Sequence, residues 1–407
     1  MVEKKNIYDR LITLMIALLA LGGIGGALQP IRVFIIICIP FALKYLITRS
    51  LIRKHYQYES LFFIFWWIWA VASLFWAIHP DESIKEVFYL AVNFNVLFVI
   101  IWLANKAQNP QRSIVQGWIF LFLLTLPIAL YELLFDVHLS LSFHDSDVMM
   151  NYGAIIIERR FASVTYGNLN GYNTILCYIL PFIIVNFYKT FGKRNSIYYI
   201  MLTVLISVII IWNGSRSAIF ALIIGLLLFY LYYSKKSKFT FISVIVLTCV
   251  LGYFIFMYFG NIFDVIFSRL QEQGLEDEGR AENIKSGFDA LLNSSLLGVG
   301  VGNYAPVMEQ KYRLEIINPH NMILEIAVQY GIFILIGFLF FIFRIFKKMK
   351  QNEDMPNKTL VITALCMFPF AMIIDSSHLL NPYVWVFFAS LYIIADAYYN
   401  HSYHINN

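Results

Sequence analysis

The stretch NPHNMILEIAVQYGIFILIGFLFFIF, residues 318–343, joins a polar head directly to a long apolar run. A helix that crosses a bilayer needs roughly 20 mainly apolar residues, and the run over 322–346 is long enough. Asn318 is a favourable N-cap, and Pro319 suits the first helical position. The stretch therefore predicts a helix that begins at its polar head, with His320 in the first turn, and continues as a membrane span.

The whole chain shares this apolar character. Of its 407 residues, 60% are hydrophobic and only 14% are charged, and the mean hydropathy is +0.69. Soluble domains carry about 25% charged residues. The apolar runs are continuous rather than alternating, which argues against a transmembrane β-barrel. Helices satisfy their own backbone hydrogen bonds in lipid, so we expect an all-α polytopic membrane protein that forms a single integral membrane domain over residues 1–407.

Apolar runs separated by polar segments predict about twelve transmembrane helices. The N-terminal head is charged and is followed by an apolar run without a small-residue cleavage site, so the first span is expected to be retained. The predicted spans are 11–28, 33–48, 61–78, 85–104, 115–135, 173–190, 197–213, 217–233, 239–259, 322–346, 359–375 and 382–399.

Sidedness follows from the distribution of Lys and Arg, which favour cytoplasmic loops. With both termini cytoplasmic, 20 of the 30 Lys and Arg residues fall in inner segments and 10 in outer ones. The net charge of +5 is thus explained by membrane topology, and nucleic acid is not expected as a partner. The expected location is the bacterial cytoplasmic membrane.

Two long loops fall on the outer side, at 136–172 and at 260–321 between the ninth and tenth spans. Inner loops are short and leave no room for a cytoplasmic catalytic domain. Any chemistry is therefore expected at the extracytoplasmic face, where ATP and nucleotide sugars are not available. A substrate there must carry its own activation, for example a sugar on a lipid-linked pyrophosphate.

Cysteines give no sign of a metal site. All four lie far apart inside apolar runs and lack metal-ligand spacing, so they are expected to pack in the core without forming disulfides. They are Cys38, Cys177, Cys249 and Cys366.

Arginines on the outer side break the charge rule and need a reason. Arg216 lies in WNGSRSAIF, where Ser215 is a plausible N-cap for the next span. The free backbone N–H groups of a first helical turn attract anions, and a guanidinium adds a planar fork that fits phosphate. The alternative is an arginine that reaches out to lipid headgroups.

A second pair of outer arginines, Arg159 and Arg160, opens the polar segment RRFASVTYGNLNGYNTILC. Asparagines here suit hydrogen bonds to a sugar, and tyrosines suit stacking on one. The alternative is that the Asn and Gly residues form a turn and cap the following span. The residues concerned are Tyr166, Asn168, Asn170, Tyr172 and Asn173.

The large outer loop contains a helical pattern. Apolar residues recur at helical spacing at Ile284, Phe288, Leu291 and Leu292, and Arg280 is one turn earlier. We expect an amphipathic helix on the outer membrane surface, which directs Arg280 toward the level of a lipid pyrophosphate. The glycines of GVGVGN follow a helix rather than a strand, so they do not form a dinucleotide fingerprint and are expected to let backbone pass close to a helix or a substrate.

If the helix begins at Asn318, His320 and Asn321 lie in its first turn and Glu325 lies one turn further on, on the face of Asn321. The positive end of a helix dipole disfavours imidazolium, so His320 is expected to stay neutral and able to accept a proton. His378, in DSSHLLNP, also precedes a span and is the rival candidate for this role.

Taken in order, these pieces resemble the O-antigen ligase/Wzy polymerase family. The matching pieces are RFASVTYGNLNGY, SRSA with Arg216, the helix of Arg280 followed by LLGVGVGNY, and PHNMILEIAVQYG; together they cover roughly residues 159–345. Two departures, Phe220 for the Leu of an Arg-x-x-x-Leu pattern and Ile334 for a second Gly after Gly331, point away from a ligase in particular.

The resemblance implies a C-type glycosyltransferase-like membrane fold and an inverting transfer that needs neither a metal nor a cofactor. It implies that Arg216 and Arg280, helped by Arg159 or Arg160, bind the pyrophosphate of an undecaprenyl-pyrophosphate-linked glycan donor. His320 would deprotonate the hydroxyl of a glycan acceptor, and Asn321 and Glu325 would add substrate contacts.

Polymerase and ligase differ in the acceptor, and both remain open. A polymerase uses a second lipid-linked repeat, whereas a ligase uses lipid A core or a protein. The Lys-, Ile-, Asn- and Tyr-rich composition indicates a low-GC genome and favours a polymerase of capsule, exopolysaccharide, O-antigen or teichuronic-acid-like polymer. A glycolipid flippase is the alternative from another class, although no half-to-half repeat supports it. Membrane lipid, a flippase and a chain-length regulator are the expected partners.

Overall fold

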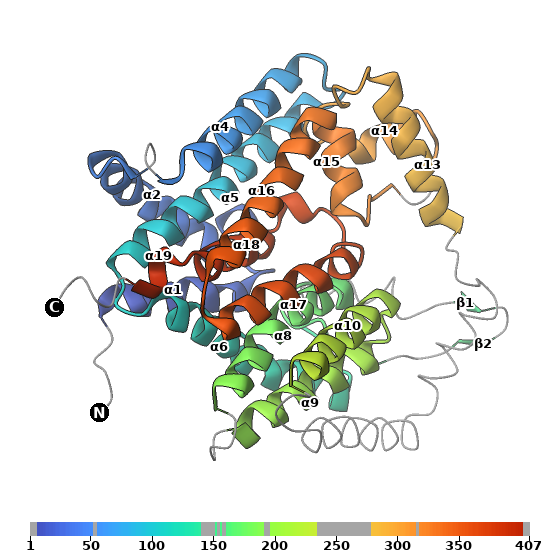
Figure 1. Ribbon diagram of the computed structural model, residues 1–407. Helices are drawn as coiled ribbons and strands as arrows, with labels where there is room; N and C mark the ends of the chain where they lie inside the picture. Colours follow the sequence, from blue (N-terminus) through green and yellow to red (C-terminus); the bar gives the residue numbers. More distant parts are fainter. Residues whose placement is uncertain are drawn as a thin grey trace.

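The computed structural model describes residues 6–51, 55–139, 151–152, 155–156, 160–190, 196–233, 278–314 and 317–401 (Figure 1). The predicted span 239–259 lies outside the described residues. The α-helices are α1 Ile7–Ala17, α2 Pro30–Thr48, α4 Gln57–Ala72, α5 Pro80–Lys106, α6 Pro110–Phe135, α8 Leu169–Thr190, α9 Ser196–Asn213, α10 Arg216–Tyr233, α13 Glu278–Asn293, α14 Tyr304–Gln310, α15 Met322–Tyr330, α16 Ile332–Gln351, α17 Met355–Ala371, α18 Pro382–Ala395 and α19 Tyr398–His401.

Short elements join these helices. Two-residue strands, β1 Asn151–Tyr152 and β2 Ile155–Ile156, pair antiparallel within the first long loop. Four 3-10 turns lie at helix ends, namely η1 Leu18–Leu21, η2 Gly26–Leu28, η3 Ser73–Phe75 and η4 His378–Leu380. Of these turns, η4 lies in a loop that the charge rule places outside, whereas η1, η2 and η3 lie within the predicted spans 11–28 and 61–78.

The predicted helical membrane architecture is confirmed. Among the described residues, six helices are long and apolar enough to cross a membrane, namely α2, α4 with η3, α5, α6, α8 and α9. The total of twelve spans and the positions of the outer loops stay predictions. The first predicted span, 11–28, is wrong in its extent, because α1 ends at Ala17 and a 3-10 turn follows.

Helices α5, α8 and α18 form the centre of the bundle. Each is apolar around most of its circumference, which is typical of a helix with neighbours on all sides. All fourteen residues of α18 are buried, and α5 packs against both α2 and α18 while α8 packs against α9 and α17. Figure 1 shows α17 beside α8 and α10, and α13 and α14 next to α15 at one end of the molecule.

The predicted continuous span 322–346 is wrong, because the chain breaks at Gly331 into α15 and α16. Gly331 has φ 84° and ψ 176°, a conformation that is essentially restricted to glycine. Both ends of α15 form hydrogen bonds with other segments of the chain. Met322 N–H donates to the Met372 carbonyl at 3.3 Å, and Trp69 Nε1 donates to the Tyr330 carbonyl at 2.9 Å. The helix that carries the polar head is thus separate from α16.

Replacing Gly331 by alanine is expected to destabilise the protein strongly. A Cβ at this position would lie 2.5 Å from the Leu296 carbonyl oxygen, and the backbone conformation alone costs about 1–3 kcal/mol for other residues. Gly26→Ala is the matched control, since Gly26 also has positive φ but has nothing within 4 Å of its Cβ position. Thermal unfolding of the detergent-purified protein measures the stability of both variants. Equal melting temperatures for Gly331→Ala and Gly26→Ala would contradict the expectation.

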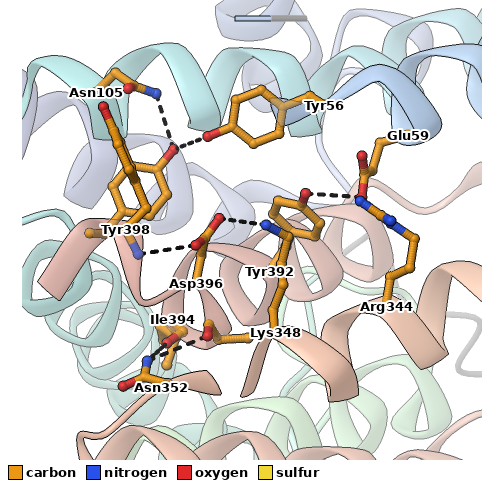
Figure 2. Close-up of polar contacts among 12 residues, drawn as sticks. Tyr56, Glu59, Asn105, Arg344, Lys348, Asn352, Tyr392, Ile394, Asp396 and Tyr398 are labelled. Carbon is orange, nitrogen blue, oxygen red and sulfur yellow. Dashed lines mark hydrogen bonds and ion pairs between the residues drawn. The ribbon is translucent and has the colours of Figure 1, made fainter. Parts of the chain in front are cut away.

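Polar residues from segments assigned to the inside gather at one end of the bundle (Figure 2). Arg344 Nε donates to the buried carboxylate of Glu59 at 2.7 Å, and Tyr392 donates to the same oxygen at 3.0 Å. Lys348 pairs with Asp396 at 2.7 Å. These contacts tie α4, α16 and the end of α18 together, away from the loops that the charge rule places outside.

At the opposite end, the GVGVGN segment joins α15 to the turn between α4 and α5. Gly300 N–H donates to the Gln329 carbonyl at 3.1 Å, and Val301 N–H donates to Ser73 Oγ at 2.9 Å. A Cβ on Gly298 would lie 2.5 Å from the Gln329 carbonyl oxygen. The expectation that these glycines let backbone pass close to a helix is confirmed, and that helix is α15.

Candidate functional site

Helix α13 confirms the helix predicted in the large outer loop. Ile284, Phe288 and Leu292 are 40%, 55% and 65% exposed and lie four residues apart, so they form one apolar stripe. Leu291, which was predicted for the same face, is instead buried at 5% exposure and belongs to the side of α13 that faces α15. The exposed stripe suits contact with lipid, and the opposite side fixes α13 to the bundle.

The polar head of the opening stretch differs from its prediction. The N-cap of α15 is Asn321, whose side-chain oxygen accepts from Ile323 N–H at 3.0 Å and Leu324 N–H at 3.2 Å. The prediction that Asn318 caps the helix and that His320 lies in its first turn is therefore wrong. His320 precedes the helix and has φ 36°, a backbone conformation that is uncommon outside glycine.

Two anchors hold His320 in this conformation. On its N-terminal side, Asn283 Nδ2 of α13 donates to the Asn318 carbonyl at 3.0 Å, and Tyr304 of α14 donates to Asn283 Oδ1. On its C-terminal side, Met322 N–H donates to the carbonyl of Met372, just past the end of α17. The strained backbone is thus imposed by α13, α14 and α17 together, as strained residues at functional sites commonly are.

Arg280, His320 and Asp375 converge at this point. Arg280 Nη1 donates to the Ile373 carbonyl at 3.5 Å, in the turn that follows α17. The imidazole of His320 lies close enough to both Arg280 and Asp375 for each to shift its pKa, and it also contacts the Asp375 backbone. A cation, an imidazole and a carboxylate from three distant segments therefore meet beside one turn.

The pKa of His320 lies below its usual value of 6.5. Burial is the main cause, and the positive charge of Arg280 adds to it, while Asp375 opposes the shift. A neutral imidazole was expected from the dipole of a helix that begins at Asn318. The direction agrees with that expectation, but the cause is burial next to a guanidinium.

His378, the rival base, is fully buried at 0% exposure, whereas His320 is half-buried. Burial lowers the pKa of His378 to about 4. Its backbone N–H donates to Glu325 Oε2 at 3.0 Å. His320 is therefore the more accessible of the two histidines.

Asn321 and Glu325 make contacts within the protein. The Asn321 oxygen caps α15, as described above. Glu325 is 2% exposed, and its carboxylate holds the η4 turn through the His378 N–H. Both side chains fix α15 and the turn after α17 relative to each other, which positions the neighbouring His320 and Asp375.

Arg216 is the first residue of α10 and is half-buried. One turn later, the ring of Phe220 stacks on Phe370 with centroids 6.2 Å apart. Phe370 lies in the last turn of α17, so Arg216 starts a helix whose first turns pack beside the same α17 end that Arg280 contacts. The structure thus brings Arg280 and His320 together and places Arg216 on a neighbouring element.

Arg160 lies elsewhere. Its guanidinium donates to the Leu134 carbonyl at 2.8 Å, near the C-terminus of α6, where a positive charge is favourable. The chain that follows is anchored by Glu132, whose Oε2 accepts from Ser163 N–H at 2.7 Å, and by Asn213, which accepts from Ala162 N–H at 2.8 Å. Arg159 lies outside the described residues.

Sequence reasoning gave Asp375 no role in the site. The residue lies four positions after α17 ends, and the predicted span 359–375 had placed it at a helix end. Its Oδ2 accepts from Tyr383 at 2.7 Å. The only signal in the sequence was that Asp375 is a carboxylate three residues before His378, at the end of a predicted span. Its connection with His320 comes from the packing of α15 against the turn after α17.

Two comparisons with known proteins indicate the class of this chain. Residues 201–342 match the model of a protein family described as O-antigen ligase. The chain is also 23% identical over 353 residues to the teichuronic acid biosynthesis protein TuaE of Bacillus subtilis (strain 168), a match that covers 81% of this chain and 70% of that protein.

The apolar helical fold and the partial family match support a membrane glycan polymerase or ligase of the cell envelope, a glycosyltransferase-like class of enzymes. Both similarities support the O-antigen ligase/Wzy-like family that the sequence motifs predict. The matched segment contains Arg216, Arg280, His320, Asn321 and Glu325 and ends inside α16. The family implies lipid-linked glycans as substrates and a membrane-lipid environment.

Proposed function

We propose that the protein polymerises undecaprenyl-pyrophosphate-linked oligosaccharide repeats by an inverting, metal-independent glycosyl transfer at the outer face of the cytoplasmic membrane. The observation that carries the proposal is the meeting of Arg280, His320 and Asp375 beside the turn after α17. An uncharged imidazole next to a guanidinium supplies a proton acceptor and an anion-binding group at one place.

In this reaction the acceptor hydroxyl loses its proton to His320 as its oxygen attacks the anomeric carbon of the donor glycan. The bond between that carbon and the pyrophosphate oxygen breaks, and undecaprenyl pyrophosphate leaves with the electron pair. Arg280 and Arg216 stabilise the negative charge that develops on the leaving group. Asp375 stabilises the imidazolium that forms on His320, which then returns its proton to solvent.

Polymerisation is favoured over ligation because the similar B. subtilis protein takes part in teichuronic acid biosynthesis. The composition of the chain points to a low-GC genome, in line with that source. Ligation of the glycan to a lipid or protein acceptor is the second candidate function, and it is supported by the description of the matching family as O-antigen ligase.

Purified protein in nanodiscs with lipid-linked repeats as the sole glycan tests the proposal. A polymerase produces a ladder of longer lipid-linked chains, and the ladder is expected to persist in EDTA. A ligase produces no ladder until an acceptor such as lipid A core or a protein is added. Movement of unaltered lipid-linked repeats across the bilayer without any lengthening would identify a flippase and reject glycosyl transfer.

The pH dependence of kcat/KM is expected to have its acid limb below pH 6.5, because the pKa of His320 is lowered from that value. Activity falls as pH drops through this pKa, since imidazolium cannot accept a proton. Arg280→Ala should move the limb to higher pH, because the guanidinium lowers the pKa, and Asp375→Asn should move it to lower pH. Profiles of kcat/KM against pH, normalised to their plateaus, measure these shifts. If the acid limbs of the wild type, Arg280→Ala and Asp375→Asn coincide, His320 is excluded as the titrating group.

A further inference from the structure

The side of α13 that faces α15 carries a buried asparagine to which the proposed mechanism gives no role. Asn283 comes three residues after Arg280 and is 2% exposed. Residues three apart on a helix are neighbours on one face, so both side chains extend from the same side of α13. Arg280 reaches the turn after α17, and Asn283 reaches Asn318, two residues before His320.

A glycine brings α13 close enough to α15 for this contact. Gly287 is one turn after Asn283, and a Cβ at this position would lie 3.1 Å from Leu324 Cδ1. Carbon atoms in favourable contact are about 3.5–4.0 Å apart, so a larger residue would push the two helices apart. The glycine thus sets a spacing at which Asn283 can bond to the chain that enters α15.

The amide of Asn283 is oriented from both sides. Its Nδ2 donates to the Asn318 carbonyl at 3.0 Å, and its Oδ1 accepts from the Tyr304 hydroxyl. A carbonyl oxygen can only accept, so a reversed amide would leave two oxygens facing each other. Tyr304 is itself 2% exposed and lies in a buried cluster with Leu324 and Val328 of α15. Asn283 therefore presents a fixed donor to Asn318.

The chain between Asn318 and Met322 is short and is held at both ends. The Asn318 carbonyl is bonded to α13, and the Met322 N–H is bonded to a carbonyl just past the end of α17. The ring of Pro319 locks its φ near about −65°, and Asn321 is held by its own bonds to the first turn of α15. His320 is left to close the path between these fixed points, and it does so with φ 36°.

The backbone of His320 also decides where its imidazole lies. Within the described part of the chain, its Nδ1 is buried without a hydrogen-bond partner, and no side chain there donates to the ring or accepts from it. The position of the ring therefore follows that of the backbone. A positive φ is uncommon outside glycine, so loss of the bond to Asn318 would let His320 return to negative φ and turn its ring away.

We propose that Asn283 is a positioning residue for the glycosyl transfer, because its bond to the Asn318 carbonyl keeps His320 in the backbone conformation that places the imidazole at the outer site. This inference rests on the proposed function, in which His320 is the base. Asn283 acts through His320 and is assigned no contact with donor or acceptor. It holds the segment that carries the base to the same helix that carries Arg280.

Replacing Asn283 by leucine tests the role, because leucine is similar in size and adds no charge next to Arg280. In chain lengthening by full-length protein in nanodiscs, Asn283→Leu is expected to lower kcat about tenfold or more, since a misplacement of about 1 Å can cost about 10²-fold. The KM for lipid-linked repeats should change less than about twofold, because Asn283 is assigned no part in uniform substrate binding.

A matched control and a second variant accompany this test. Asn293→Leu removes another amide donor of α13, which bonds to the Tyr312 hydroxyl at 3.3 Å on the surface, and is expected to keep the wild-type kcat. Tyr304→Phe removes the hydroxyl that orients Asn283 and keeps the ring in its buried cluster. It should fold even if Asn283→Leu does not, and it should lower kcat by a smaller factor. Wild-type kcat in every folded variant of Asn283 and Tyr304 would overturn the proposal.

The same substitutions in the His320→Ala protein separate positioning from a general loss of structure. If Asn283 acts through His320, Asn283→Leu and Tyr304→Phe lower kcat in the wild type but leave the residual transfer of His320→Ala unchanged. An equal fold loss in both backgrounds would overturn the positioning role and leave the proposed function standing. Full transfer in His320→Ala would instead refute the proposed function, and this inference with it.

Discussion

Replacing His320 by alanine is expected to lower the rate of glycan transfer by about 10²- to 10⁴-fold, the range of a general base, while the protein stays folded. The imidazole is half-buried beside Arg280 and Asp375, and its pKa is lowered, so the neutral form that accepts a proton predominates at neutral pH. Removing it takes away the proton acceptor of the proposed mechanism. Chain lengthening of lipid-linked repeats by purified protein measures the loss.

The controls distinguish a lost base from a lost fold. His79→Ala removes another histidine of the outer end, which contacts Gln310, and is expected to keep its activity. His320→Ala should bind the donor and melt at the temperature of the wild type, because the side chain of His320 caps no helix. Wild-type rates in His320→Ala, with loss in His378→Ala in a protein that still folds, would transfer the role of base to His378.

Replacing Arg280 by alanine is expected to reduce transfer by about 10²- to 10³-fold, the effect of removing one group that stabilises a developing anion. Arg280 extends from the first turns of α13 toward the Ile373 carbonyl and the ring of His320. Without it, charge that develops on the leaving pyrophosphate loses a planar, bidentate partner. Arg280→Lys should recover only part of the rate, because an ammonium lacks the fork.

Arg216→Ala is expected to act in the same direction as Arg280→Ala and mainly to weaken binding of the donor. The matched control is Arg313→Ala, which removes an exposed arginine of the predicted outer loop 260–321 that also carries Arg280. This variant should leave transfer unchanged. Donor saturation curves at fixed pH give the comparison. If Arg280→Ala and Arg313→Ala have equal effects, general surface charge rather than a pyrophosphate site explains the arginines.

Helices were predictable from the sequence because their cause is local. The apolar runs that became α2, α5, α6, α8 and α9 each satisfy the length and hydropathy that a bilayer requires. The helix over Glu278–Asn293 followed from its spacing of apolar residues, although Leu291 turned out to face the bundle.

The path of the opening stretch was not predictable in the same way. An Asn-Pro pair favours a helix start at Asn318, yet Asn321 caps α15 and His320 stays outside it. The reason is competition from tertiary contacts. The Asn318 carbonyl accepts a hydrogen bond from α13, and the Met322 N–H donates one to the chain just past the end of α17. Gly331 similarly breaks the run because GVGVGN and the preceding Leu296 pack against its backbone.

The sequence by itself determined that this chain is a helical membrane protein, and it singled out Arg216, Arg280 and His320, because hydropathy, charge distribution and short motifs act over one or two helical turns. Only the tertiary structure decided that Asp375 joins Arg280 and His320. The physical reason is that such a meeting depends on the packing of α13, α15 and α17, segments nearly a hundred positions apart between Arg280 and Ile373, which no local pattern encodes.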